Sequence, residues 1–334
     1  MSTEQQQEAG AAQEAGAGAG AEGRPAGRWG TRAVEVPGAV LSVTGPTAEP
    51  SAGLPEALFV HGLGGSSDNW TDLMSALGGE VRGEALDLPG FGWSAPPLDG
   101  NVSVSGHVRA VIGYLEASGR GPVHLVGNSL GGAVAVRLTA LRPDLVRSLT
   151  LISPALPELP PQRTALPTGL LAVPGATRLI QRIPSGGRSV EQATDGLLDL
   201  VYGNAGAIPA ERREQAVTEY RRRMALPYAL QMLVGSARGI VSAYTERGEQ
   251  ALWRQAERVE VPVLLIYGLR DKLVSYRSAA RACAAFRDAR LLVLPESGHV
   301  AMMEHPELVA RSVRAFLREV AAREVRGAAE GSDF

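Results

Sequence analysis

Short apolar runs alternate with helical segments along most of this chain, and this alternation is the feature that most constrains its fold. Within each run the apolar residues follow one another almost without interruption, which is typical of strands buried on both faces. Strands separated by helices join a sheet as parallel neighbours. The sequence therefore predicts an α/β fold, in which helices cover both faces of a mostly parallel sheet. The runs lie at residues 57–60, 123–126, 149–152, 263–267 and 291–294, and the helical segments at 69–77, 103–117, 130–141, 275–286 and 306–324.

Three shorter strands are predicted in the first third of the chain. Residues 32–36 and 39–43 are joined by Pro37-Gly38, which indicates a hairpin-like pair. Residues 84–88 form a short strand that ends in Pro89-Gly90. Proline and glycine favour turns at both places because they fix or free the backbone angles that a turn requires.

The alternation stops after residue 152 and returns at residue 263. The intervening segment is helical and loop-like, with several prolines and no convincing strand. We therefore expect one α/β domain, residues 31–152 and 252–325, interrupted by a helical insertion at 153–251. The first 30 residues are nearly all Ala, Gly, Glu or Gln and have no periodic apolar face, so they are predicted to be a disordered tail. Residues 326–334 are predicted to form a C-terminal tail.

Charge and composition argue against several classes of function. Lys and Arg total 33 against 35 Asp and Glu, so the formal net charge of −2 provides no basic surface for nucleic acid or an acidic membrane. The single cysteine, Cys283, cannot form an intrachain disulfide. No apolar run reaches the roughly 18 residues that a membrane-spanning helix needs, and the first ten residues lack the features of a secretory signal. We expect a cytoplasmic protein with a small-molecule substrate, no nucleic-acid partner and no membrane insertion. The oligomeric state is not predicted.

The candidate nucleophile is Ser129, in the sequence Gly127-Asn128-Ser129-Leu130-Gly131. This sequence lies where a buried strand ends and a helix begins. A sharp strand-to-helix turn needs small residues on both sides of the serine, because the backbone packs too closely there for a Cβ. The turn would place the hydroxyl at the N-terminus of a helix, whose positive end stabilises negative charge that develops during acyl transfer.

A serine needs a neighbouring base to become a good nucleophile, and His299 is the candidate. It follows the strand at 291–294, at the carboxyl edge of the sheet, where catalytic groups gather in open α/β folds. Of the other four histidines, His61 is assigned to supporting a loop and His124 to the core. His107 falls within a helix, and His305 begins the last one.

The base needs a carboxylate that orients it, and Asp271 is the candidate. It follows the strand at 263–267 and therefore lies at the same edge of the sheet. Glu158, beyond the preceding strand, and Glu296, in the loop of His299, are the nearby alternatives. The oxyanion of the intermediate needs backbone donors, for which we select the N–H of Leu130 and that of Leu63, in His61-Gly62-Leu63-Gly64-Gly65.

Together these motifs resemble those of the α/β-hydrolase superfamily in order and spacing, from about residue 31 to 324. The resemblance implies a mostly parallel sheet of the eight-stranded type, a Ser-Asp-His order of the triad, and a helical cap within 153–251. Serine at position 129 distinguishes the chain from the dehalogenases and epoxide hydrolases of the superfamily, which use aspartate there. The motifs are His61-Gly-Leu-Gly-Gly65, Asp87-Leu-Pro-Gly-Phe-Gly-Trp-Ser94, Gly127-Asn-Ser-Leu-Gly-Gly132, Gly268-x-x-Asp271 and Gly298-His299.

The sequence therefore predicts a serine hydrolase that cleaves a carboxylic ester through an acyl-enzyme. Apolar residues recur through the insertion, which favours a substrate with an apolar acyl or alcohol part. Gly127-Asn-Ser-x-Gly-Gly132 is also similar to the carbon–carbon hydrolases of meta-cleavage products, although these commonly carry Trp where Val300 follows His299. Thioester hydrolysis, perhydrolysis, acyl transfer and a non-catalytic sensor are the remaining alternatives. No cofactor and no metal are implied, because the histidines lack the paired spacing of a zinc site.

Overall fold

The computed structural model describes residues 28–48, 51–158, 162 and 189–331, with side chains described up to Arg326. Most of the predicted disordered tail, residues 1–27, lies outside these ranges. Eight strands form one sheet in the order β1-β2-β4-β3-β5-β6-β7-β8. The strands are β1 Trp29–Val36, β2 Ala39–Pro46, β3 Glu56–Val60, β4 Arg82–Leu86, β5 Val123–Asn128, β6 Val146–Ile152, β7 Val263–Gly268 and β8 Ala289–Leu294.

The sheet is mostly parallel, as predicted. Only β2 pairs antiparallel with its neighbours β1 and β4, whereas every pairing from β4 across to β8 is parallel. The predicted hairpin is present, and Gly38 adopts φ 81° at its turn. Strand β1 begins at Trp29, inside the segment predicted as a tail, because β2 continues far enough for Pro46 to pair with Trp29.

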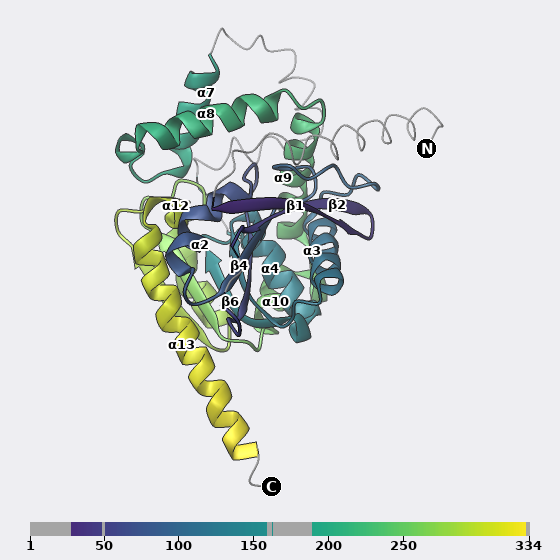
Figure 1. Cartoon of the computed structure of the whole chain (residues 1–334), viewed down its shortest axis with the longest axis vertical. Helices are drawn as coiled ribbons and strands as arrows, with labels where there is room; N and C mark the ends of the chain where they lie inside the picture. Colours follow the sequence, from purple (N-terminus) through teal and green to yellow (C-terminus); the bar gives the residue numbers. More distant parts are fainter. Residues whose placement is uncertain (1–27, 49–50, 159–161, 163–188, 332–334) are drawn as a thin grey trace.

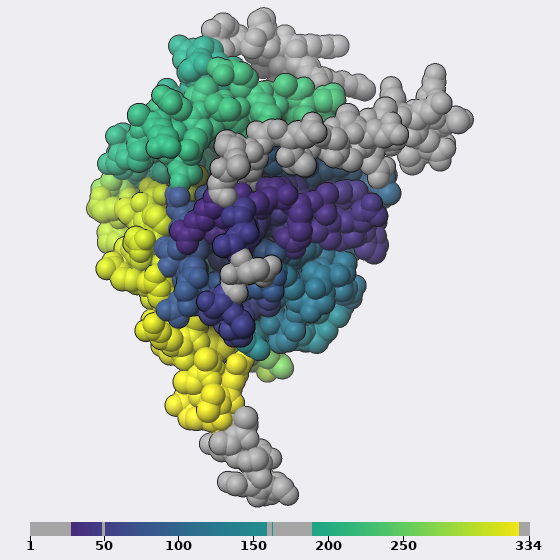
Figure 2. All heavy atoms as spheres, viewed as in Figure 1, coloured from purple at the N-terminus to yellow at the C-terminus, as the bar shows by residue number. Residues whose placement is uncertain are grey.

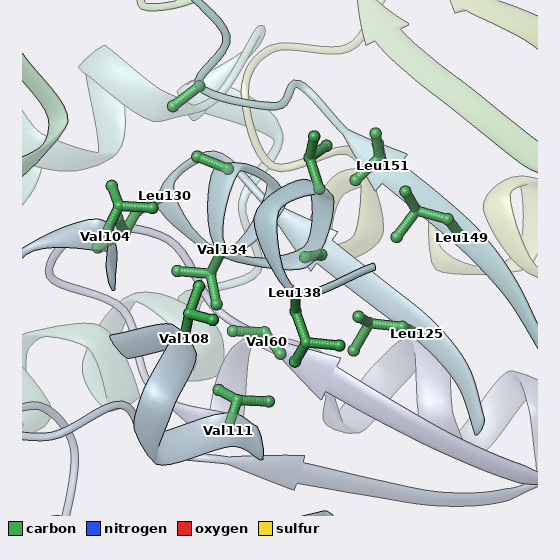
Figure 3. Packing of buried hydrophobic residues seen from close by; sticks show 14 of the residues in the cluster. Val60, Val104, Val108, Val111, Leu125, Leu130, Val134, Leu138, Leu149 and Leu151 are labelled. Atoms are coloured by element: carbon green, nitrogen blue, oxygen red, sulfur yellow. The ribbon is translucent and has the colours of Figure 1, made fainter. Parts of the chain in front are cut away.

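Helices cover both faces of the sheet. Alternate residues of each central strand face opposite sides, so Val60 packs with α3 and α4 while Phe59 packs with α2 and α13. Figure 3 shows the first of these layers, in which valines and leucines of α3 and α4 point toward β3, β5 and β6. The helices of the two layers are α2 Thr71–Leu77, α3 Val104–Ser118, α4 Leu130–Leu141, α10 Leu252–Glu257, α11 Ala279–Ala285, α12 Ala301–Glu304 and α13 Pro306–Gly331.

The last helix is longer than the sequence pattern indicated. Helix α13 passes the predicted end at residue 324 and continues through Gly331, into the segment predicted as a tail. Its final turns project away from the body of the molecule (Figure 1). Apolar periodicity marks only the part of a helix that packs against something, so it gave no indication of this projecting end.

In the described part of the chain between β6 and α10, the α-helices are α7 Val190–Val201, α8 Ala210–Met224 and α9 Ala229–Thr245. We call them the inserted helices. Helices α7 and α8 form a layer at the end of the molecule opposite the projecting end of α13 (Figure 1, Figure 2). Leu198 and Met232 are buried, whereas Leu197 and Met224 are 38% and 49% exposed. Four other apolar residues of the insertion, at 166, 170, 171 and 173, lie outside the described residues.

Candidate active site

The backbone at Ser129 forms the sharp turn that the sequence predicted. Strand β5 ends at Asn128, α4 begins at Leu130, and Ser129 between them has φ 52° and ψ −116°. A non-glycine residue rarely adopts a positive φ, and such strain is concentrated at functional sites. Glycines on both sides are required sterically, because a Cβ at Gly127 would lie 2.5 Å from the carbonyl oxygen of Gly131, and one at Gly131 would clash with the carbonyl of Val60.

His299 and Asp271 form a buried hydrogen-bonded pair. The distance from His299 Nδ1 to Asp271 Oδ2 is 2.9 Å, and the two side chains are 6% and 0% exposed. A carboxylate can only accept, so Nδ1 carries the proton and Nε2 is left as the basic nitrogen. Asp271 Oδ1 accepts two further hydrogen bonds from the backbone N–H groups of Leu273 and Val274, at 2.8 and 3.0 Å.

These contacts keep Asp271 ionised. Burial alone would raise the pKa of this carboxyl group. The charge and hydrogen bond of His299, together with the two backbone N–H groups, outweigh burial, so the pKa of Asp271 is lowered overall. A charged carboxylate is what an imidazolium would need beside it during proton transfer.

The two alternative acids lie elsewhere. Glu158 Oε2 accepts a hydrogen bond from the N–H of Ser275 at 3.1 Å. Glu296 forms an ion pair with Arg270 at the surface, and its side chain is 66% exposed. Within the described residues no hydrogen bond or ion pair joins either carboxylate to His299, whereas Asp271 is bonded to it.

Ser129 is joined to the histidine loop through its neighbour Asn128. The Nδ2 group of Asn128 donates to the carbonyl oxygens of Ile152 and His299, both at 3.0 Å. No hydrogen bond joins Ser129 Oγ to His299 within the described residues. Such bonds are often long in an enzyme without substrate and tighten in the complex. Sequence reasoning assigned no role to Asn128, although a buried amide next to the candidate nucleophile was a signal that it had a partner.

The two predicted oxyanion donors lie on facing segments. Leu130 is the first residue of α4, where a backbone N–H has no partner within the helix. Leu63 lies in a turn that is closed by a 3.0 Å hydrogen bond from Gly65 N to Gly62 O. This turn approaches the nucleophile closely, since a Cβ at Gly62 would be 3.0 Å from the Cβ of Ser129.

His61 supports the turn, as the sequence analysis expected. Its Nδ1 donates to the carbonyl of Gly62 at 2.7 Å, and its Nε2 accepts from the N–H of Leu88 at 3.0 Å. Complete burial lowers the pKa of His61, which favours the neutral ring that this pattern requires. The ring therefore joins the turn of residues 62–65 to the loop after β4.

The loop from Asp87 to Ser94 is held in place by hydrogen bonds of Asp87. Asp87 accepts hydrogen bonds from the backbone N–H groups of Ser67 and Trp93, at 2.6 and 2.8 Å. The hydroxyl of Ser94 donates to the carbonyl of Asp87 at 2.6 Å. A Cβ at Gly92, where φ is 54°, would clash with the carboxylate of Asp87.

Other titratable and concave features lie apart from this constellation. His107 and His124 are buried and hydrogen-bonded to Ser236 and Ser148. In the described part of the chain, no group of three or more His, Cys, Asp or Glu side chains is placed to hold a metal ion, and no helix there is long and apolar enough to cross a bilayer. A cavity of about 400 Å³ beside α9 is not lined by any of the predicted catalytic residues.

Curated relatives share roughly a quarter of their residues with this chain. The acetoin-cleaving system's dihydrolipoyllysine-residue acetyltransferase component from Cupriavidus necator is 28% identical over 261 residues, or 77% of this chain. The chain spans only 62% of that relative's length, and 63% of its Pseudomonas putida counterpart. A Xenopus laevis monoacylglycerol lipase, abhd6-B, is 26% identical, over 79% of this chain and 75% of its own.

A fourth relative is named for a different substrate. The 2-hydroxy-6-oxo-6-(2'-aminophenyl)hexa-2,4-dienoic acid hydrolase of Metapseudomonas resinovorans is 26% identical, over 80% of this chain and 86% of its own. Among solved structures, a bacterial membrane phospholipase A superposes with a TM-score of 0.72 at 23% identity, covering 94% of this chain and 92% of that one. This likeness concerns the fold alone.

A family model described as alpha/beta hydrolase fold matches residues 58–306. Since that match spans well over half of the sequence, the chain belongs to the alpha/beta hydrolase fold family, as its motifs predicted.

Proposed function

We propose that this protein is a serine hydrolase that cleaves carboxylic esters through an acyl-enzyme. The observation that carries the proposal is the buried pair of His299 and Asp271, in which Nδ1 holds the proton and Nε2 is free to act as a base. The carboxylate of Asp271 is held ionised, and the loop of His299 is hydrogen-bonded to Asn128, the residue before Ser129. These are the properties that a serine needs in its partners to become a nucleophile.

In the proposed reaction Ser129 Oγ attacks the ester carbonyl carbon while His299 Nε2 takes its proton. Asp271 stabilises the imidazolium that forms. The N–H groups of Leu63 and Leu130 bind the negative oxygen of the tetrahedral intermediate. The intermediate collapses when His299 returns the proton to the leaving alcohol, which leaves an acyl group on Ser129. A water molecule, activated by the same histidine, then releases the acid.

The inserted helices are proposed to act as a cap over this site, with residues 153–251 as the cap segment and 31–152 and 252–325 as the catalytic domain. Two neighbouring arginines of α8 support this. Arg223 donates to the carbonyl of Gly64 in the predicted oxyanion turn. Arg222 donates to the carbonyl of Gly92 at 2.9 Å and lies 4.0 Å from the ring centre of Trp93. The apolar residues of these helices favour a substrate with an apolar acyl or alcohol group.

Carbon–carbon bond hydrolysis is the second candidate. The sequence Gly127-Asn-Ser-x-Gly-Gly132 favours it, and a relative is named as a hydrolase of a dienoic acid. Val300 follows the histidine where Trp is common in that group. The same triad could also cleave thioesters or transfer an acyl group, and the first two relatives are named as acetyltransferase components.

A substrate panel distinguishes these reactions. The full-length protein is given p-nitrophenyl esters of increasing acyl length, acyl thioesters and a dienone acid, with the Ser129→Ala variant as the control. Fast turnover of esters that Ser129→Ala abolishes is the expected result. Turnover confined to the dienone would replace the ester proposal with the second candidate. No turnover and no labelling of Ser129 by a fluorophosphonate would contradict both and indicate a non-catalytic protein.

A further inference from the structure

The loop that carries His299 lies directly against the end of an inserted helix. The N–H of His299 donates to the carbonyl of Val201, the last residue of α7, at 2.8 Å. The backbones at Gly298 and at residues 201–202 are also packed closely together. A Cβ at Gly298 would lie 2.7 Å from the carbonyl oxygen of Val201 and 2.7 Å from Tyr202 C. The base is therefore held by a segment that reaches it from outside the sheet.

One carboxylate binds both backbones. Glu304, at the end of α12, accepts the N–H of Gly298 on Oε1 at 2.7 Å, together with the hydroxyl of Ser297 at 3.2 Å. Its other oxygen, Oε2, accepts the N–H of Gly203 at 2.8 Å. The carboxylate thus bridges the loop of the base and the chain that follows α7. In Figure 1 helix α12 lies next to the inserted helices, at the end of the molecule that they cover.

The opposite side of the same residue is fixed to the candidate nucleophile. The carbonyl of His299 accepts from Asn128, so its N–H is held by α7 while its C=O is held by the residue before Ser129. Hydrogen bonds on both main-chain groups determine where the Cα–Cβ bond of a residue points. A shift at the end of α7 would therefore move the imidazole relative to Ser129.

We propose that residues 201–203, together with Glu304, position the catalytic base, so that His299 reaches its working geometry only while α7 is seated. This rests on the proposed role of His299 in ester hydrolysis. Glu304 and Gly203 are positioning residues that do not touch the substrate. A misplacement of about 1 Å can cost on the order of a hundredfold in rate, so modest displacement of α7 is sufficient to reduce turnover strongly.

Gly203, just after α7, and Gly196, within it, provide a matched pair of variants. A Cβ at Gly203 would lie 2.6 Å from the carbonyl oxygen of Glu296 and 2.7 Å from Gly298 N, so Gly203→Ala forces the two backbones apart. Gly196, within α7, has nothing within 4 Å of such a Cβ. We expect Gly203→Ala to lower kcat by roughly 10- to 100-fold with little change in KM, and Gly196→Ala to leave both within twofold.

Glu304→Gln tests the carboxylate. The amide keeps the size of the side chain, but its NH₂ faces a backbone N–H that needs an acceptor. Glu307→Gln, at an exposed position in the first turn of α13, is the control. Both variant pairs are compared by the rate at which a fluorophosphonate labels Ser129, across pH 5–9, and by the low-field NMR signal of the His299 Nδ1 proton. That signal is identified by its loss in Asp271→Asn.

The NMR signal reports the position of the base even if the protein hydrolyses no ester, so the two proposals fail separately. A shifted or broadened signal, with labelling slowed at least tenfold in Gly203→Ala and Glu304→Gln but not in their controls, supports the proposal. An unchanged signal and unchanged labelling in both variants would overturn it. If Glu304→Gln does not fold, Gly203→Ala alone decides by the same two criteria.

Discussion

Asn128 and His299 are 171 residues apart in the chain, yet the side-chain amide of one donates to the main-chain carbonyl of the other at 3.0 Å. The same amide also donates to the carbonyl of Ile152 at the end of β6. Asn128 therefore donates one hydrogen bond to the loop of His299 and one to the end of β6, and both bonds require it to be a donor.

Asn128→Asp removes this donor while keeping the shape. The carboxylate would face two carbonyl oxygens, so we expect the protein to lose about 1–3 kcal/mol of unfolding free energy and most of its activity. Urea unfolding and kcat on one activated ester measure the two effects. Asn101→Asp is the matched control. The side-chain oxygen of Asn101 accepts hydrogen bonds from the N–H and the hydroxyl of Ser103, and a carboxylate oxygen can accept the same bonds. If both variants behaved alike, Asn128 would have no special positioning role.

Asp271→Asn should leave the fold intact and lower kcat/KM by about 10⁴, as in the comparable protease triad. The amide keeps the size of the side chain but loses the charge, and it favours the wrong tautomer of His299. The measurement is kcat/KM on one activated ester, with circular dichroism to verify folding. Glu158→Gln and Glu296→Gln are the controls, because within the described residues no hydrogen bond or ion pair joins either carboxylate to the histidine. A rate within threefold of wild type for Asp271→Asn, with collapse of either control, would assign the acid elsewhere.

Buried neutral histidines should make the protein sensitive to acid. Burial lowers the pKa of His124 to about 4, so the unfolded chain binds a proton there that the folded chain does not. The stability that this group contributes is complete above its unfolded pKa of about 6.5 and is lost progressively as the pH falls toward 4. The expected slope is up to about 1.4 kcal/mol per pH unit.

His124→Gln removes this titration and keeps a polar partner for Ser148, so unfolding free energy measured in urea at pH 7, 6 and 5 should fall less steeply than in wild type. His305→Gln, at a partly exposed position, is the comparison. Equal slopes for wild type and His124→Gln would mean that His124 titrates alike in the folded and unfolded states. His107, whose pKa burial lowers to about 3, would contribute in the same direction.

The central strands were predictable because their apolar runs are nearly continuous and end in turns. Strand β7 extends one residue beyond its predicted end, and α4 has its predicted bounds. Strand β4 was placed at residues 84–88 but spans Arg82–Leu86. The reason is that Asp87 and Leu88 are fully buried in a loop, and burial in a loop gives the same apolar pattern as burial in a strand. Helix α12 has only four residues, too few to show a period.

The residues of the proposed triad were found by their places after successive strands, since parallel strands bring their carboxyl ends to one edge. The roles of Asn128 and Glu304 were not found from the sequence. Their partners are main-chain groups of segments far away in sequence, and the sequence pattern carries no information about main-chain groups. The contact between α7 and the loop of His299 was not predictable either, because it depends on how α7 packs on the rest of the molecule, and no local sequence pattern determines that packing.

Ser129 is the proposed nucleophile, and the most direct test of that role is the turnover of an activated ester by Ser129→Ala beside wild type. Loss of the nucleophile of a triad costs on the order of 10⁶ in kcat in the best-studied case. We expect the variant to fall to the background rate, to resist fluorophosphonate labelling, and to keep the unfolding transition of the wild type. A variant that retained more than about a tenth of the wild-type rate would require another nucleophile and would contradict the proposed mechanism.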